Sequence, residues 1–327
     1  MNGYLIARKI VQVVVLVLLM AVFIFIVFRL MPGNPAELFV RDLKGRAVTK
    51  AQITALEQQL GLYGGKWSLT DFLIYMRDMF TFNFGMDYYQ QASVWGLIER
   101  AMPYTLLLLG SAAILSFVVG LPLGIEATWW RGRKKEAVAV TSSLVLNSIP
   151  FFVLAIILLL YLTIAVRLFP IRSTFPYSYF LQPSLPHVAA IIRDIALPLI
   201  VLLVVEAAGH LLTMRAAMIS VLGEDFIQTA RAKGVSEHSI MFHHAARNAM
   251  IPVSTRMALE FALLTSGAVI VGIIFSWPGI GPLIYQATLQ EDYPFAEGAF
   301  FVISLIVILA YSVIDFVHAW LDPRISL

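Results

Sequence analysis

The stretch that decides the fold is Gly223–Pro252, GEDFIQTARAKGVSEHSIMFHHAARNAMIP. It is a polar, helix-prone segment between two long apolar runs, in a chain that is otherwise mostly apolar. A helical pattern follows Asp225, and Gly234 supplies the left-handed residue that commonly ends such a helix. The apolar side of this helix comprises Phe226, Ile227 and Ala230. The polar side comprises Gln228, Arg231 and Lys233.

The second half of the segment predicts another helix. Ser236 can act as its N-cap, and Glu237 lies in the first turn, where the helix dipole favours a negative charge. One face of this helix comprises Ile240, Met241, His244 and Ala245. Pro252 lies where the next apolar run begins, as a kink or first-turn residue. The predicted shape is helix, glycine corner, helix.

Two interpretations of this segment compete. It is either a cytoplasmic loop whose cations only fix the topology, or a docking element for a soluble partner. The stretch Phe226–Gly234 matches the pattern F-[IV]-x-T-A-R-A-K-G, and it resembles the cytoplasmic EAA loop of ABC-importer permeases of the dipeptide and oligopeptide family. Gln228, Thr229 and Ala230 replace the glutamate and two alanines of the general consensus, and the glycine-to-proline spacing is longer, as is usual in the peptide branch. The resemblance assigns coupling to an ATPase to Phe226, Ile227, Gln228, Thr229, Ala230, Arg231, Ala232, Lys233 and Gly234.

Composition independently indicates an integral membrane protein. The chain is 60% hydrophobic and 13% charged, with a mean hydropathy of +0.84, whereas roughly a quarter of residues are charged in soluble domains. The net charge of +3 does not indicate nucleic-acid binding, because the cations lie at the ends of apolar runs, where the positive-inside rule places them. With zero cysteines, the sequence excludes disulfides, thiolate metal sites and a cysteine nucleophile.

The apolar runs predict an all-α protein with six transmembrane helices and both termini in the cytoplasm. The predicted spans are 10–28, 103–128, 137–166, 191–214, 255–277 and 298–320. The first is expected to be a retained span and not a signal peptide, because the run is long and no small-residue cleavage site follows it. Pro150 should kink the third span unless a loop breaks the run there. The predicted parts are a first helix (1–30), an external helical insertion (31–100) and a five-helix core (101–327) that includes the loop 223–252.

The insertion is expected to be a small packed helical cap. Thr49 and Gln52 form a capping-box pattern for one helix, and Ser68 and Asp71 open another. The second helix has an apolar face of Phe72, Tyr75, Met76, Met79 and Phe80. A later outer segment contains FPYSYF, Phe175–Phe180, which is either an interfacial aromatic belt or a substrate-facing rim.

Further motifs resemble the same family in the same order. They are the R-x-x-P-G-x-P element at Arg29–Pro35, the PGIG and EDYP elements within Trp277–Pro294, and the tail Asp322–Arg324. The resemblance implies the type I ABC-importer permease fold in the cytoplasmic (inner) membrane of a prokaryote. It also implies a sister permease subunit, an external solute-binding protein and two cytoplasmic ATP-binding subunits, which bind ATP and Mg.

The chain itself shows no catalytic or cofactor-binding motif. It has no G-x-x-x-x-G-K-[ST] loop, so it is expected not to be an enzyme, and adjacent His243 and His244 cannot share a helix face for a metal. Ionisable residues within spans are functional candidates by default. The pathway candidates are Glu206, His210 and Glu260, for which inter-helical pairing is the alternative.

The sequence therefore predicts the membrane subunit of an ATP-driven, binding-protein-dependent importer for oligopeptides or dipeptides. An importer of the same class for oligosaccharides or a nickel chelate is the first alternative. A proton-coupled secondary transporter that uses Glu206, His210, Asp315 and His318 is a more remote one. An intramembrane enzyme lacks a convincing pair of catalytic residues.

Overall fold

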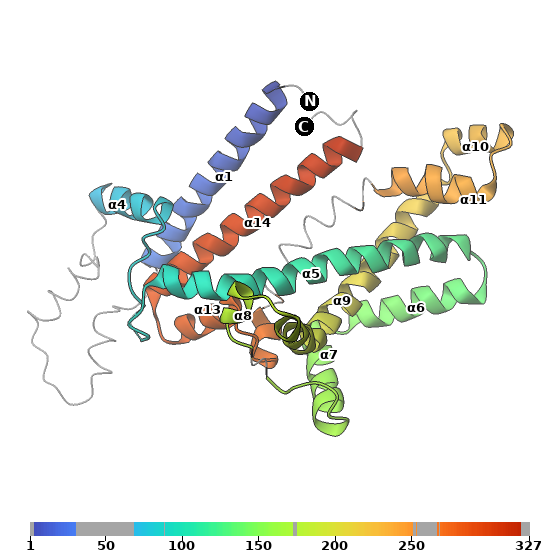
Figure 1. The fold of residues 1–327 in the computed structure, drawn as a ribbon. Helices are drawn as coiled ribbons and strands as arrows, with labels where there is room; N and C mark the ends of the chain where they lie inside the picture. The colour runs from blue at the N-terminus through green and yellow to red at the C-terminus, as the bar shows by residue number, and fades with distance from the viewer. Residues whose placement is uncertain are drawn as a thin grey trace, which may run out of the picture. The chain divides into compact units, whose positions relative to one another are not determined.

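The computed structural model of the chain describes residues 3–30 and 69–321, apart from 88, 173–174, 251–252, 254–266 and 268. Over these residues the secondary structure is helical, and strand pairing is limited to an isolated bridge between Met86 and Ser93 (Figure 1). The chain divides into two compact units, of which the first contains 1–102 and 282–309 and the second contains 103–281 and 310–327. The all-α prediction is confirmed for the described residues.

The first unit contains α1 and α4 and parts of three helices that continue into the second unit. Their bounds are α1 Gly3–Leu30, α4 Leu69–Phe80, α5 Val94–Trp129, α13 Ile280–Leu289 and α14 Tyr293–Leu321. The rings of Phe72 and Tyr75 on α4 lie 5.2 and 5.1 Å from the ring of Phe25 on α1. The Tyr75 hydroxyl donates to the backbone oxygen of Ala21 at 3.3 Å. This helix of the predicted insertion is therefore packed, as expected.

A second contact in this unit explains one glycine of α14. A Cβ atom at Gly298 would lie 2.7 Å from Cγ of Phe84, so a larger residue there would displace the phenylalanine ring. The ring of Phe84 also lies 6.1 Å from that of Phe301. The helix predicted after Thr49 falls outside the described residues.

Besides helical residues at 246–250 and 269–274, the described part of the second unit contains eight further named helices. They are α6 Lys134–Ser148, α7 Phe151–Leu158, η1 Leu159–Ala165, α8 Ser178–Leu181, α9 Leu185–Val221, α10 Asp225–Ala232, α11 Glu237–Ser239 and η2 Ile240–Ala245. Both η segments are π-helical. The longest helices, α5 and α9, contain 36 and 37 residues and extend beyond the apolar runs that predicted them.

Four described helices are long and apolar enough to cross a membrane: α1, α5, α9 and α14. The pair formed by α6 and the α7–η1 segment is a fifth candidate if it is one broken span, and its two halves are bent by 95°. Most of the predicted fifth span, 255–277, falls outside the described residues. A membrane protein with several spans is confirmed, while the count of six stays a prediction.

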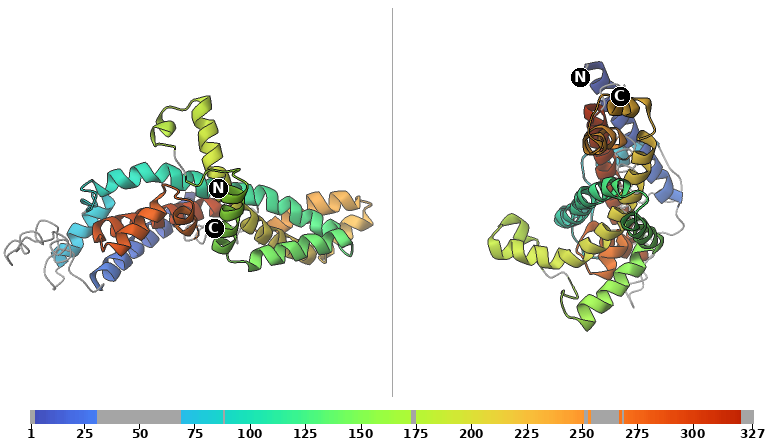
Figure 2. Two further views of the ribbon diagram at one scale, coloured as in Figure 1. Left: turned by 90° about the horizontal axis from the view of Figure 1, so that it is seen from below. Right: turned by 90° about the vertical axis from the view of Figure 1, so that its right-hand side faces the viewer.

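The bend between α6 and α7 occurs at Pro150. The first helix ends at Ser148, and Pro150 is the N-cap of the next helix, whose Val153 amide donates to its carbonyl at 2.9 Å. Proline has no amide hydrogen and disfavours the helical conformation at the residue before it, so a stop here is expected. Figures 1 and 2 show α7 leaving the direction of α6. Of the two outcomes predicted for Pro150, the structure has the break.

Two glycines bring α5 and α9 close together. A Cβ atom at Gly120 would lie 2.6 Å from the Cβ of His210, and one at Gly124 would lie 2.6 Å from the Cβ of Met214. Spaced four residues apart, the glycines form the small-xxx-small pattern that permits close contact between membrane helices. This contact joins the longest helices of the second unit.

An aromatic cluster lies within the same unit. The Trp277 indole N–H donates to the backbone oxygen of Tyr104 at 3.0 Å, and the Tyr104 hydroxyl donates to that of Phe175 at 3.1 Å. The ring of Phe180 lies 4.9 Å from that of Tyr104. Since Phe175 and Trp277 are buried, the front of the FPYSYF segment contributes to the core of this unit.

Candidate functional site: the segment 223–250

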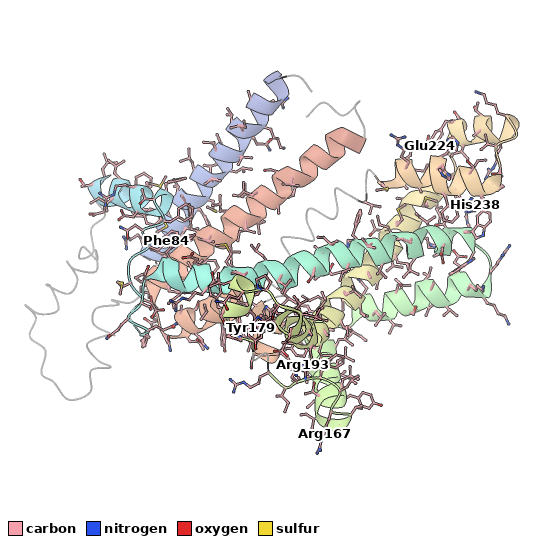
Figure 3. All side chains as sticks on the ribbon, in the orientation of Figure 1. Phe84, Arg167, Tyr179, Arg193, Glu224 and His238 are labelled. Atoms are coloured by element: carbon pink, nitrogen blue, oxygen red, sulfur yellow. The ribbon has the colours of Figure 1, made fainter. Side chains whose placement is uncertain are left out.

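The corner between α10 and α11 is built by backbone hydrogen bonds. The Val235 amide donates to the Ala230 carbonyl at 3.2 Å, and the Gly234 amide donates to the Arg231 carbonyl at 2.9 Å. These two bonds and the φ of +80° at Gly234 define a Schellman motif, in which glycine is favoured because it has no Cβ. The predicted helix, glycine corner and helix are therefore present. Figure 3 labels Glu224 and His238, which lie before and after the corner.

One side of α10 is buried and the other is exposed. Ile227 is fully buried and Ala230 is 8% exposed, a spacing of three residues that places both on one helix face. The exposed residues of the predicted coupling set are Phe226, Gln228, Thr229, Arg231, Ala232, Lys233 and Gly234.

The prediction that Phe226 lies on the same apolar side as Ile227 and Ala230 was wrong, since its side chain is 43% exposed. Successive residues on an α-helix are separated by 100°, so Phe226 points away when Ile227 faces the core. The face left free for a partner is therefore polar with one aromatic residue.

The buried side of α10 belongs to a cluster that connects it to the long helices. Ile227 belongs to the same buried cluster as Leu121 of α5, Met214 and Met218 of α9 and Ile240 of η2. At the end of α5, Trp129 lies 6.3 Å from Phe242, whose ring stacks on His238 at 4.5 Å. The cluster therefore joins α10 to α5, α9 and η2 by apolar contacts.

A π-helical turn changes which residues of the second helix are buried. Ile240, Met241 and Ala245 are buried as predicted, but His244 is exposed, and Ala246 and Ala249 take the later core positions. The turn Ile240–Ala245 is π-helical, and its wider winding moves each later residue back by one position relative to an α-helix. His244 is the residue that this shift removes from the core.

An ion pair links the two sides of the corner. Nε and Nη2 of Arg231 lie 2.8 and 3.2 Å from the two carboxylate oxygens of Glu237. This bidentate hydrogen bond lowers the pKa of the Glu237 carboxyl below its ordinary value of 4.5 and raises that of Arg231. This pairing is not evident from the sequence, in which Arg231 lies on the polar side of one helix and Glu237 in the first turn of the next.

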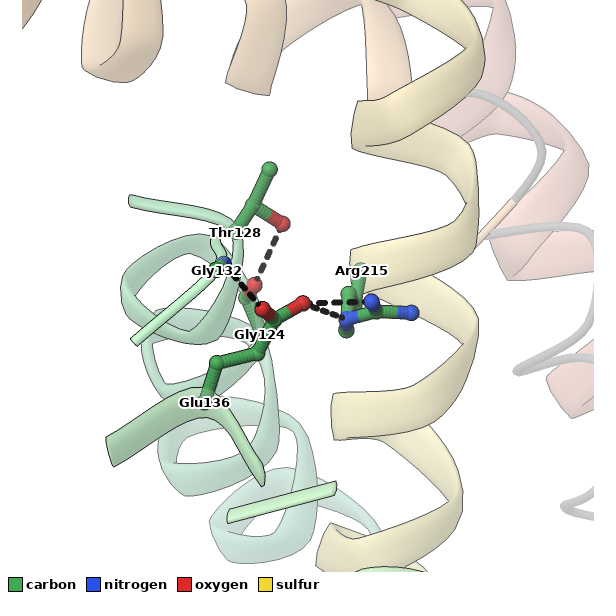
Figure 4. A network of polar contacts seen from close by, with 5 residues as sticks. All are labelled: Gly124, Thr128, Gly132, Glu136 and Arg215. Carbon is green, nitrogen blue, oxygen red and sulfur yellow. Dashed lines mark hydrogen bonds and ion pairs between the residues drawn. The ribbon is translucent and has the colours of Figure 1, made fainter. Parts of the chain in front are cut away.

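A second polar contact fixes the turn after α5 to α9. The Glu136 carboxylate accepts from Nε of Arg215 at 2.9 Å, from Nη2 of the same residue, and from the Gly132 amide at 2.6 Å (Figure 4). This contact was not predicted from the sequence. Its signal is that Glu136 is the one acid beside a run of cations, RGRKKE.

The pathway candidates lie in different environments. His210 is 3% exposed, at the close contact of α5 and α9, with the Phe117 ring 5.8 Å away, whereas Glu206 is partly buried on the same helix. Glu260 falls outside the described residues. His210 is therefore in an inter-helical position, and its role in transport stays a prediction. In the part of the chain that the structure describes, no three His, Cys, Asp or Glu side chains form a candidate metal site.

Comparisons with known proteins agree on one family. The sequence model described as "Binding-protein-dependent transport system inner membrane component" matches residues 120–327, and the model of the corresponding N-terminal region matches residues 1–109. A Sinorhizobium fredii protein named "Probable peptide ABC transporter permease protein" is 30% identical over 323 residues, covering 99% of each chain. The glutathione transport system permease protein GsiC of Salmonella typhi is 30% identical over 318 residues, covering 97% of each chain.

A solved structure shares the fold. An inward-facing structure of the MetNI methionine ABC transporter matches with a TM-score of 0.52 and 17% identity, covering 69% of this chain and 96% of the other. The predicted ABC-importer permease fold is confirmed by this match together with the family models.

Proposed function

Because this chain belongs to the family of binding-protein-dependent transport system inner membrane components, we propose that it is the permease subunit of an ATP-driven importer of peptides. Membership makes the chain a multi-pass transport component of the inner membrane that works with ATPase and substrate-binding components. The proposal adds the substrate, the surface that contacts the ATPase, and the composition of the complex.

The observation that supports an ATPase contact is the two-sided character of α10. Ile227 and Ala230 attach it to the cluster with α5 and α9, while its other side is exposed and includes Gln228, Arg231 and Lys233. A helix that only connected two spans would need no such rigid attachment. We assign this exposed face to a groove of an ATP-binding subunit, so that closure of the ATPase pair moves α10 and, through it, α5 and α9.

The proposed complex contains three other kinds of subunit: a sister permease of the same six-helix type, two cytoplasmic ATP-binding subunits and an external solute-binding protein. The two permeases lie in the lipid bilayer. ATP and Mg are bound by the ATP-binding subunits, and this chain itself binds no cofactor and catalyses no reaction. Both of its termini lie in the cytoplasm, on the same side as α10.

The substrate proposal is supported by the names of the relatives. Two that match the chain almost from end to end are named for peptide and for glutathione transport. These names favour peptides over the oligosaccharides and nickel chelates considered from the sequence.

The test is transport by the complete complex in liposomes. The chain is co-expressed with its neighbouring permease, ATPase and binding-protein subunits, and uptake of labelled trialanine is measured with and without ATP. ATP-dependent trialanine uptake is expected. Uptake of labelled maltotriose with none of trialanine would contradict the peptide assignment and leave the importer assignment standing.

A pair of substitutions at one position tests the role of α10. Gly234→Val places a β-branched residue at φ +80°, which costs at least about 1–2 kcal/mol, so about a tenfold loss of uptake is expected with unchanged membrane insertion. Gly234→Asn is the matched control, because asparagine tolerates this conformation and no atom lies within 4 Å of the added Cβ. Normal transport by Gly234→Val would exclude α10 as the coupling element.

A further inference from the structure

An open pocket, which we call the cavity, has charged and apolar lining residues and lies beside the turn that joins α5 to α6. Its volume is about 460 Å³, and the charged side chains that line it are Arg133, Lys134, Glu136 and Arg215. The position is outside α10 and its buried cluster, so the cavity has no part in the function proposed above.

The cavity is surrounded by positive charge. Arg131, Arg133, Lys134 and Lys135 are all exposed, and the ammonium group of Lys135 lies over the Trp130 ring at 5.5 Å. Glu136 does not offset these four cations, because its carboxylate is engaged by Arg215 and by the Gly132 amide.

Along α6, the cavity is lined by apolar side chains and one hydroxyl group. Ala137, Val140 and Thr141 also line it, and their spacing of three and four residues places them on one helix face. Nearby on α6, Val138, Leu144 and Val145 are exposed by 68, 52 and 54%. An occupant would therefore meet cations at one end and a hydrocarbon surface at the other.

The place of the turn in the chain puts the cations at a membrane surface. α5 is a candidate span that ends at Trp129, and α6 begins at Lys134. Adjacent Trp129 and Trp130 suit the headgroup region, because tryptophan is enriched where an apolar ring meets water. Basic pockets between membrane helices at this level are suited to acidic phospholipid headgroups.

We propose that this cavity binds an anionic phospholipid, with its phosphate against Arg133 and Lys134 and its glycerol and upper acyl chain along Ala137, Val140 and Thr141. A free phosphate would satisfy the cations but would leave the apolar face uncovered. A soluble protein partner would not require an apolar surface that continues along α6.

The test is native mass spectrometry of the purified importer complex, titrated with phosphatidylglycerol in detergent. The wild-type complex should retain phosphatidylglycerol over phosphatidylcholine. Removal of two cations in R133Q/K134Q should weaken phosphatidylglycerol binding by about thirtyfold, because each surface cation contributes about a factor of five. The matched control is R167Q/R172Q, which removes two exposed cations from outside the cluster and should bind as the wild type does.

A steric variant distinguishes a cavity from diffuse attraction. Ala137→Trp keeps every charge, and since Ala137 is exposed the substitution is compatible with folding, yet the indole fills the cavity and should also weaken phosphatidylglycerol binding. Undiminished binding by this variant overturns the proposal. So does displacement of the lipid by millimolar inorganic phosphate, which would identify a free-anion site. Loss of the ATP-binding subunits from R133Q/K134Q with lipid binding unchanged would instead identify a protein-docking surface.

Discussion

The pair formed by Arg231 and Glu237 holds α10 against the start of the next helix. Because hydrogen bonds from Arg231 lower the folded-state pKa of Glu237 below 4.5, the pair stabilises the corner at pH values above that unfolded-state value. The stabilisation is lost as the pH falls through the lower, folded-state pKa. We therefore expect the corner to open locally in acid, with no effect between pH 6 and pH 8.

Hydrogen–deuterium exchange of the backbone over residues 223–240 measures this opening. After correction for the intrinsic exchange rate, protection should be constant near neutrality and fall below pH 4.5. Glu237→Gln has no carboxylate to titrate, so its exchange should be faster at neutral pH and independent of pH. An identical acid-induced loss of protection in that variant would assign the effect to other groups.

At the residue scale, the sequence predicted positions that depend on local backbone chemistry. Gly234 and Ser236 take the corner and N-cap positions expected of them, and the Ser236 hydroxyl accepts from the Ser239 amide at 3.3 Å. Phe226 and His244 were misassigned. Both errors concern the direction in which a side chain faces. For Phe226 that direction is set by tertiary packing, and for His244 by the π-helical turn, neither of which a pattern with a period of 3.6 residues can predict.

At the scale of helices, the contact between α5 and α9 depends on Gly120 and Gly124. A methyl group at Gly120 would lie 2.7 Å from the Ala207 carbonyl oxygen, and one at Gly124 would lie 2.8 Å from that of Leu211. Because these oxygens belong to the backbone of α9, α5 and α9 must move apart to make room for the added methyl group. We expect Gly120→Ala or Gly124→Ala to destabilise the protein by about 1–3 kcal/mol, as overpacking of a tight contact does.

Gly110→Ala provides the matched control on the same helix. No atom lies within 4 Å of the Cβ position there, so the substitution adds only the higher helix propensity of alanine and should leave stability unchanged or slightly raised. Thermal unfolding of the three variants in detergent compares them directly. Equal unfolding temperatures for all three would show that α5 and α9 do not rely on close backbone contact.

The helices themselves were more predictable than their ends and partners. Apolar runs located α1, α5, α9 and α14, but α5 begins at Val94 and not at Pro103, because its first turns are polar enough to escape a hydropathy criterion. Glu136 and Arg215 are 79 positions apart in the sequence. The local pattern RGRKKE singles out Glu136 but does not identify Arg215 as its partner, because only the packing of α6 on α9 brings the two together.

For the whole molecule, composition and motif order identified the class that the comparisons confirm. The fold follows from few physical constraints, since the backbone N–H and C=O groups of a chain in lipid must form their hydrogen bonds within helices. What those constraints leave open is the path of the α6–α7–η1 segment, which either crosses the membrane with a break at Pro150 or enters and returns on the same side. The positive-inside rule favours crossing. Four cations in Arg131–Lys135 mark the cytoplasmic side, whereas the segment between the bend and α9 contains only Arg167 and Arg172.

Cysteine labelling decides between these paths, and the absence of native cysteine removes any background. Four exposed positions are each replaced in turn: Arg133→Cys, Arg167→Cys, Gln182→Cys and Glu224→Cys. If the bent pair is one span, a membrane-impermeant maleimide should label positions 167 and 182 in right-side-out vesicles, and positions 133 and 224 only after detergent is added. Labelling of 133 and 167 under the same condition would show a re-entrant segment. The count of six spans and the shared cytoplasmic side of the termini would then both fail, because each later helix would cross in the opposite direction.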